Sequence, residues 1–317
     1  MTNGRITQED YQRVLHSEQG FRGQSAVIAT EFLHSPNKKH ICKFMVVMFL
    51  SNLSAEGSNY MSVCATMFKY LYGWGDKEAV NLSLMNSLYT VGIMVGTILA
   101  GKLLISGRKL AFLATLAIGL LGSLMTFIIS WPVFLIAKLI CGMYLGMMLL
   151  VTGRFIEEYV PTAYYGPCAA VACFAMNLGS LLASMLGSVL PPDDSEEIKT
   201  TNRYLIVYAM QPIIQVACLV TFYLIVWTDT PKFCLEKGHI EKARHVIRKI
   251  YNVENDELKE RNILRFFQVT SNKDGCHVTM MQALFTDSRY TRATWICITA
   301  IFFQVFCGFF GVIAYAN

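Results

Sequence analysis

Long apolar runs separated by short polar segments dominate the pattern of this chain. Seven runs are long enough to cross a bilayer, because the hydrocarbon core accommodates about 20 apolar residues of a helix. The apolar residues form continuous blocks instead of the one-sided periodic stripes of a soluble core. The pattern therefore predicts an all-α membrane protein. The predicted spans are 44–66, 82–101, 110–130, 133–152, 167–190, 204–227 and 293–316.

Composition agrees with this prediction. Hydrophobic residues make up 54% of the chain and charged residues only 15%, whereas soluble domains have about 25% charged residues. The first run begins at residue 44, which is too late for a cleaved signal peptide. We therefore expect the first run to act as an uncleaved anchor.

Positive charge collects in alternate segments between the runs, and this predicts the orientation of the protein. The arm before the first run, the loop with Lys102, Arg108 and Lys109, and the long segment 228–290 are all rich in Lys and Arg. By the positive-inside rule these segments, including the N-terminus, lie in the cytoplasm. The net charge of +5 is thus a topology signal and does not indicate a nucleic-acid partner.

The long segment also contains apolar residues at helical spacing among charged ones. They are Ile240, Ala243, Val246, Ile247 and Ile250. This one-sided pattern predicts an amphipathic helix that lies under the membrane bundle on the cytoplasmic side.

The sequence lacks the signatures of an ATP-driven or metal-dependent protein. It has no G-x-x-x-x-G-K-[ST] loop, and its six histidines are scattered. Neither ATP hydrolysis nor a metal site has support, so we expect no enzyme activity, no cofactor and no metal. If the protein moves a solute, a gradient drives that movement.

Several residue groups between 85 and 317 match a known order and spacing. One group comprises Lys138, Gly142, Gly146, Gly153, Glu158, Pro161 and Gly166, and another is the stretch Thr-Asp-Thr-Pro-Lys-Phe at 228–233. They resemble R-x-x-x-G-x-x-x-G, E-x-x-P and P-E-S-P-R-W of the sugar-porter branch of the major facilitator superfamily. Gly107-Arg108-Lys109 is similar to part of the loop motif G-x-x-x-D-R-x-G-R-R, and Gln304 with Gly308 is similar to Q-Q-x-x-G. No motif is intact.

The resemblance implies a complete N-terminal bundle of six helices, a cytoplasmic helical linker and the first helix of a second half. We therefore expect a cytoplasmic arm at 1–43, the six-span half at 44–227, the linker at 228–290 and the seventh span at 291–317. The family has twelve spans, whereas this chain stops at Asn317, directly after the seventh run. We expect that a missing C-terminal half, or a second copy if the chain is complete, closes the pathway.

The resemblance also implies a gate at the cytoplasmic ends of the spans. Its candidate residues are Gly107, Arg108, Lys109, Glu158, Asp229 and Lys232. We expect Arg108 and Lys109 to pair with Glu158 and Asp229, because charged groups at helix ends are stabilised by opposite charges and by the helix dipole. Such a clamp would hold the outward-open state, and its release would permit alternating access. In the alternative interpretation, Arg108 and Lys109 are only topology charges.

Two ionisable residues are predicted at similar depth inside the membrane. Glu56 lies in the first run and Lys138 in the fourth, and a helical rise of about 1.5 Å per residue places both in the outer half of the bilayer. Proton-coupled members of the resembled family place an acid opposite a fourth-span Arg. We hypothesise that Glu56 and Lys138 form a pair that protonation of Glu56 breaks. Alternatively, Lys138 reaches outward to the interface and Glu56 lines a wet cavity without titrating.

The resemblance places the substrate at the membrane midplane, between Gln side chains of the fifth and seventh spans. Gln304 keeps one of these amides, whereas Cys173 stands at the position of the fifth-span Gln. Asn177, one helical turn beyond Cys173, could replace that amide, as could Gln211 or Gln215. The pocket is therefore expected to be less polar than a hexose site, in which hydroxyls need donors and acceptors to replace lost water.

These features together predict a secondary or facilitative transporter of a small organic solute, such as a sugar or polyol, with protons as a candidate co-substrate. It would be a multi-pass protein of the plasma membrane or an internal membrane. The runner-up is an organic-ion transporter of the same superfamily, which shares the E-x-x-P and E-S-P-R patterns. A third reading is a membrane sensor or scaffold that kept the fold and lost transport, as the substituted motifs suggest.

Overall fold

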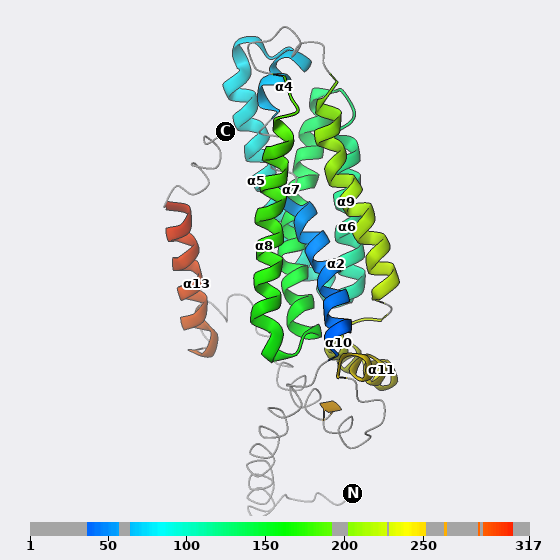
Figure 1. Cartoon of the computed structure of the whole chain (residues 1–317). Helices are drawn as coiled ribbons and strands as arrows, with labels where there is room; N and C mark the ends of the chain where they lie inside the picture. Colours follow the sequence, from blue (N-terminus) through cyan, green and yellow to red (C-terminus); the bar gives the residue numbers. More distant parts are fainter. Residues whose placement is uncertain are drawn as a thin grey trace, which may run out of the picture.

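The computed structural model describes residues 37–56, 64–191, 202–226, 228–251, 263–264, 285 and 288–306. The regular structure within these ranges is helical, and the predicted all-α class is confirmed. The long helices between Lys38 and Ile225 run side by side as one bundle, and short helices lie at its two ends (Figure 1). The long helix Ser288–Phe306 lies apart from this bundle.

The long helices follow the order of the predicted spans. Among the described residues they are α2 (Lys38–Glu56), α5 (Glu78–Ser106), α6 (Arg108–Met125), α7 (Trp131–Tyr159), α8 (Thr162–Gly187), α9 (Tyr204–Ile225) and α13 (Ser288–Phe306). In the part of the chain that the structure describes, the five helices from α5 to α9 are long and apolar enough to cross a membrane. Residues 57–63 of the first predicted span and 307–316 of the seventh lie outside the described residues.

Several helices continue beyond the apolar runs that predicted them. Helix α7 extends from the predicted end at 152 to Tyr159 and carries Arg154, Glu157 and Glu158 in this extension. A helix satisfies its own backbone hydrogen bonds, so its last turns can leave the hydrocarbon and carry charge. Hydropathy locates the apolar part of such a helix but not its end.

Helix α7 lies at the centre of the bundle, where it packs against α5, α6, α2 and α8. The contact with α5 depends on small residues. A Cβ atom added to Gly96 would overlap the backbone of Met143, and one added to Gly146 would overlap the carbonyl oxygen of Ile93. The two backbones therefore touch, which glycine permits in membrane helices.

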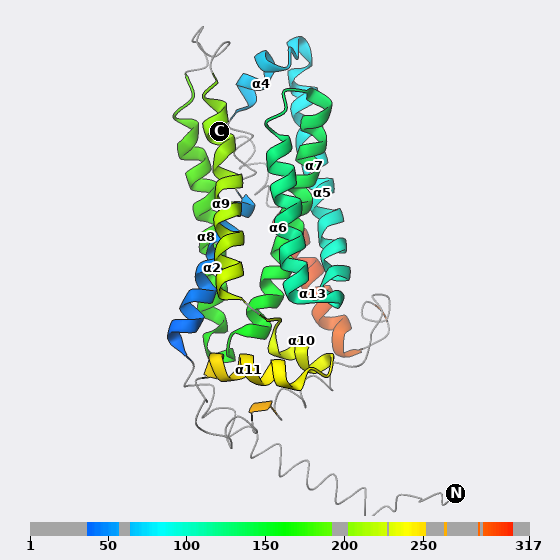
Figure 2. The same cartoon turned by 90° about the vertical axis from the view of Figure 1, so that its right-hand side faces the viewer.

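The bundle has two groups of helices, which Figure 2 shows side by side. Helices α2, α8 and α9 form one group, and α5, α6 and α7 form the other. The interior between the groups is filled with aromatic rings. Phe112 of α6 stacks on Phe222 of α9 at 4.4 Å between ring centroids, and Phe155 of α7 packs edge-on against both.

Two short helices, α10 (Pro231–Glu236) and α11 (Ile240–Tyr251), lie across one end of the bundle (Figure 2). We call this the α11 end. The opposite end carries α4 (Ala65–Leu71) and the 3-10 turn η2 (Gly75–Lys77), and we call it the α4 end.

Helix α11 has the amphipathic character that its sequence predicts. Ala243, Val246, Ile247 and Ile250 are buried. The prediction was wrong for Ile240, which is 42% exposed. Ile240 is the first residue of the helix, so it precedes the turns that pack on the rest of the protein.

Candidate functional site

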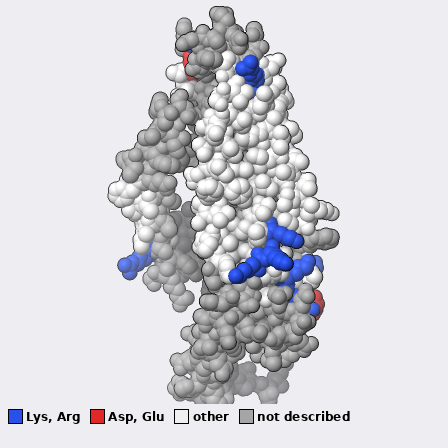
Figure 3. All heavy atoms as spheres, viewed as in Figure 1, with Lys and Arg blue, Asp and Glu red and all other residues white. Residues whose placement is uncertain are grey.

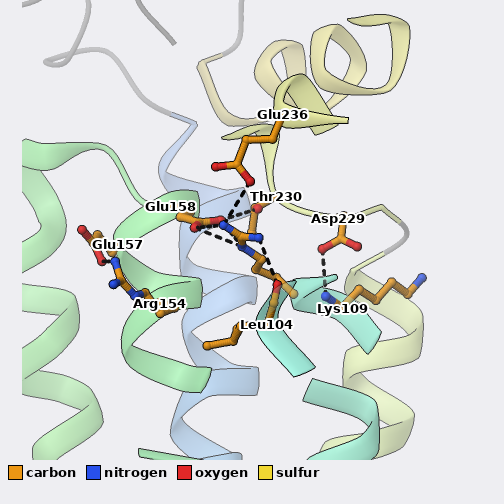
Figure 4. Close-up of polar contacts among 9 residues, drawn as sticks. Leu104, Lys109, Arg154, Glu157, Glu158, Asp229, Thr230 and Glu236 are labelled. Carbon is orange, nitrogen blue, oxygen red and sulfur yellow. Dashed lines mark hydrogen bonds and ion pairs between the residues drawn. The ribbon is translucent and has the colours of Figure 1, made fainter. Parts of the chain in front are cut away.

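A buried ion pair at the α11 end joins the first residue of α6 to the last turn of α7. The Arg108 side chain donates from Nε to both carboxylate oxygens of Glu158, at 3.1 and 3.0 Å, and from Nη2 to Oε1 at 2.8 Å (Figure 4). The Glu158 side chain is only 4% exposed and that of Arg108 only 13%. The pair is therefore shielded from water, and neither charge can lose its partner without a large cost.

The residues after the sixth span complete this cluster. The Thr230 hydroxyl donates to Oε2 of Glu158 at 2.6 Å, and Glu236 of α10 approaches Nη2 of Arg108 at 3.4 Å. The Arg108 guanidinium also lies over the Phe233 ring, 4.9 Å from its centroid. Arg108 further donates to the carbonyl oxygen of Leu104 at 3.0 Å. One arginine thus connects α5, α6, α7 and α10.

A second contact joins the α5–α6 turn to the same segment. The backbone N–H of Lys109 donates to Oδ1 of Asp229 at 2.8 Å (Figure 4). Gly107 allows this approach, since it has a φ of 153° and an added Cβ would lie 3.1 Å from Oδ2 of Asp229. Asp229 therefore accepts a hydrogen bond at the N-terminus of α6, where the helix dipole favours a negative charge.

The structure thus brings together five of the six predicted gate residues. The contact of Lys109 with Asp229 uses the backbone N–H, and the pairing of the Lys109 side chain stays a prediction. Lys232 lies half-buried in the first turn of α10. A sequence motif fixes which residues lie near a turn, but not which of their donors faces the partner.

Thr230 and Glu236 belong to this cluster but were not predicted to do so. Thr230 had a local signal, because it precedes Pro231 at the N-cap position of α10, but its side chain makes no cap hydrogen bond there. It contacts Glu158 instead, 72 residues earlier in the chain. No local pattern could have predicted that partner.

Lys138 lies inside the bundle on α7. Its side chain is buried, and its Nζ lies 5.3 Å from the centroid of the Tyr89 ring on α5. This is the distance of a cation–π contact. Glu56 is the last residue of α2, and its side chain lies outside the described residues. The hypothesis of a Glu56–Lys138 pair therefore stays a prediction.

The predicted substrate residues of α8 share one exposed face. Cys173 and Asn177 are both exposed and one turn apart, and Asn177 Nδ2 donates to the carbonyl oxygen of Cys173 at 2.9 Å. The side chain of Gln304 on α13 lies outside the described residues. Within the described part of the chain, no group of three His, Cys, Asp or Glu residues could hold a metal ion.

The alternative amides Gln211 and Gln215 lie elsewhere. Both are fully buried on α9, and Gln215 accepts a hydrogen bond from the Ser123 hydroxyl at 2.9 Å. Gln215 belongs to the packed interior between α6 and α9. Since both amides are buried, neither shares the exposed face of Cys173 and Asn177.

Comparisons with known proteins agree with this architecture. The family model described as "Sugar (and other) transporter" matches residues 41–317. Among curated relatives, Hexose transporter 1 of Toxoplasma gondii is 22% identical over 249 residues, which are 76% of this chain and 44% of that protein. Sugar transport protein 2 of Arabidopsis thaliana is 27% identical over 233 residues, 73% of this chain and 44% of that protein. The chain thus spans less than half the length of these relatives.

The fold is also found among solved structures. The xylose transporter XylE from E. coli, in a partially occluded inward-open conformation, matches with a TM-score of 0.67 at 16% identity, over 87% of this chain and 66% of that one. The proton:xylose symporter XylE bound to 6-bromo-6-deoxy-D-glucose gives a TM-score of 0.64 at 16% identity, over 79% and 57%. This chain is therefore an integral, multi-pass membrane protein of the major facilitator fold that belongs to the sugar (and other) transporter family.

Proposed function

We propose that this protein contributes to the transport of a sugar or polyol across a membrane by alternating access. In this proposal the cluster around Glu158 is a latch at the cytoplasmic side, and the exposed face of α8 borders the solute pathway. Family membership supports the class of solute, and the curated relatives include proteins named as hexose and myo-inositol transporters.

The observation that carries the mechanism is the buried contact of Arg108 with Glu158 and Thr230. It fastens the ends of α6 and α7 to the segment that leads into α10 and α11. A buried ion pair is stable when closed and costly when one partner is removed, so it favours discrete closed and open arrangements. Those are the two arrangements that a rocking carrier requires.

The solute pathway is proposed along Cys173, Asn177 and Gln304. Asn177 still has amide donor and acceptor capacity beyond its one backbone bond, and a Cys in place of an amide suits a less polar solute face. The N-terminus and α11 are proposed to lie in the cytoplasm, as the Lys and Arg distribution predicts. The membrane is the plasma membrane or an internal one.

Uptake measurements test the transport proposal. Vesicles from cells that express the protein are compared with vesicles from control cells for accumulation of labelled glucose, xylose and myo-inositol, and of tetraethylammonium. We expect saturable uptake of at least one sugar or polyol and none of the cation. Cation uptake alone would indicate the organic-ion branch, and no uptake of any solute would favour a sensor or scaffold.

Thiol labelling tests the proposed pathway on α8. Cys173 and Cys42 are exposed, whereas the other described cysteines are buried. For Cys234 on α10, burial raises the pKa to about 11, which keeps it an unreactive thiol at neutral pH. A transported sugar should slow maleimide labelling of Cys173, and a Cys173→Ser variant gives the background. Equal labelling with and without the sugar argues against this pathway.

Proton coupling is a separate part of the proposal. A buried lysine in a span is costly unless an anionic or aromatic group offsets its charge, and Lys138 has the Tyr89 ring beside it. If Glu56 is the titrating partner, Glu56→Gln should abolish accumulation against a gradient while leaving equilibrative exchange. A variant that still concentrates solute would refute the coupling role.

A further inference from the structure

A group of exposed lysines lies at one corner of the α11 end, where α2 meets α11. Lys38, Lys39 and Lys43 are exposed on the first two turns of α2, and Lys249 is exposed on the last turn of α11. The two helices are joined there by a hydrogen bond from the Asn37 N–H to the Ile250 carbonyl oxygen, at 2.7 Å. We call these four residues the corner lysines.

The corner lysines are brought together by packing and not by sequence, because Lys249 is far along the chain from the other three. Lys43 and Lys249 both lie close enough to the half-buried His40 ring for their charges to act on it. His40 is held in place by Tyr159 of α7, with Nε2 and Oη 2.6 Å apart. Three helices therefore fix the position of this cationic corner.

Within the described residues, no carboxylate forms an ion pair with any corner lysine. Four of the carboxylates that the structure describes at this end have other partners. Glu158 and Glu236 contact Arg108, Glu157 contacts Arg154, and Glu241 contacts Arg244. Like charges gathered at one place repel one another. Binding of an external anion would therefore reduce the electrostatic repulsion among the corner lysines.

The corner also lies at the end of the apolar spans. Helix α11 lies across this end of the bundle (Figure 2), and its apolar face is buried. An amphipathic helix in this position is expected to run along the boundary between the spans and water. Figure 3 shows Lys and Arg gathered at this end, over a bundle surface that is otherwise mostly uncharged. Lipid headgroups occupy this boundary, and those of the cytoplasmic leaflet are partly anionic.

We propose that the corner lysines bind the phosphate of an anionic phospholipid headgroup in the cytoplasmic leaflet, with Lys43 and Lys249 as the central contacts. The lipid would bridge α2 and α11 and so stabilise the docking of the linker helix on the bundle. This inference is independent of which solute is carried, and it is tested by binding alone.

The test uses the full chain, delipidated in detergent, and short-chain lipids that dissolve as monomers. Binding of dioctanoyl phosphatidylglycerol, dioctanoyl phosphatidylcholine and inorganic phosphate is measured by microscale thermophoresis. We expect the phosphatidylglycerol to bind at least tenfold more tightly than the other two. Each nearby lysine contributes roughly fivefold to attraction of an anionic surface, so Lys43→Gln with Lys249→Gln should weaken binding about tenfold or more.

The matched control removes two exposed lysines from the same end of the molecule. Lys242 lies two turns before Lys249 on α11, and Lys102 lies near the end of α5. Lys102→Gln with Lys242→Gln should leave phosphatidylglycerol binding within about twofold, and Lys43→Arg with Lys249→Arg should retain it. The single Gln variants are measured as well, and size-exclusion profiles without lipid establish that each variant is folded.

Three results would overturn the proposal. If the corner and control variants lose the same amount of phosphatidylglycerol binding, the lipid responds to the total positive charge of this end and the corner lysines form no specific site. Equal binding of inorganic phosphate means that the ligand is a free anion. Equal binding of phosphatidylcholine means that the headgroup charge is not recognised.

Discussion

The Glu158 carboxyl group lies in an almost dry place, between two hydrogen-bonding partners. Arg108 supplies the opposite charge and Thr230 supplies a hydroxyl donor. A second Arg–Glu pair, in the same last turns of α7, provides a natural comparison. Arg154 and Glu157 are also in contact, at 2.9 Å, but their side chains are 54% and 53% exposed. Because it is buried, the Arg108–Glu158 pair should affect the free energy of unfolding strongly, whereas the exposed Arg154–Glu157 pair should affect it little.

Arg108→Gln should strongly destabilise the protein, because it leaves a buried carboxylate without a counter-charge. The expected cost is about 3–5 kcal/mol, whereas Arg154→Gln should cost about 0–1 kcal/mol. Thermal unfolding in detergent, followed with a thiol-reactive dye, compares the two. The double variant Arg108→Gln with Glu158→Gln should recover part of the loss. Similar midpoints for the two single variants would contradict a buried role.

Thr230→Val should weaken the cluster around Glu158 without removing a charge. The valine has nearly the same shape but cannot donate to Glu158, and a hydrogen bond to a charged group contributes about 1.5–3 kcal/mol. Thr230→Ser retains a hydroxyl and should stay close to the parent in the same thermal assay. A Val variant as stable as the Ser variant would show that the hydroxyl is dispensable.

At the scale of helices, the close contact of α5 with α7 depends on glycines that the sequence places four residues apart. Gly92 of α5 lies against Gly142 of α7, whereas Gly96 faces Met143 and Gly146 faces Ile93. In each case the nearest atoms are backbone. The spacing predicts that two helices can approach closely. It does not predict which helix is the partner, since Gly179 of α8 has a similar environment against Leu53 of α2.

Gly96→Ala should prevent α5 from packing on α7, because the added methyl overlaps the backbone of Met143 and a backbone cannot rotate away. Overpacking of this kind costs about 1–3 kcal/mol or more. Gly101→Ala, on the same helix, is the control, since nothing lies within 4 Å of its added Cβ. Fluorescence-detected size exclusion should show a loss of the monodisperse peak for Gly96→Ala only. A normal peak would mean that the helices separate at little cost.

At the scale of the whole molecule, the two ends of the bundle differ in charge and in structure. The α11 end carries the Arg108–Glu158–Thr230 cluster and the corner lysines. The α4 end carries the aromatic contacts of Trp74 with Trp131 and Phe68, at 4.8 and 6.0 Å between ring centroids. Tryptophan favours the membrane–water interface. The exposed apolar surfaces of α5 and α8 between the two ends suit contact with lipid or with further helices.

Labelling from one side of the membrane tests the proposed orientation. Cys42 is exposed near the α11 end, and Lys77 is exposed in η2 at the α4 end. In intact cells a membrane-impermeant maleimide should label Lys77→Cys but not Cys42, in a background with Cys173→Ser. Permeabilised cells should give labelling at both positions. Labelling of Cys42 in intact cells would show that the protein has the opposite orientation in the membrane.

The sequence by itself determined the all-α membrane class and the order of the long helices, and the family resemblance indicated which residues gather around Arg108 and Glu158. Hydropathy and motif spacing are properties of the sequence, so they can be determined without knowledge of the fold. The tertiary structure decided that Thr230 contacts Glu158, that the Lys109 N–H contacts Asp229, and that Lys43 and Lys249 both lie near His40. It also placed Gln215 in the packed interior and not beside Cys173. These contacts join residues from different helices, and only helix packing fixes which sides of those helices face each other.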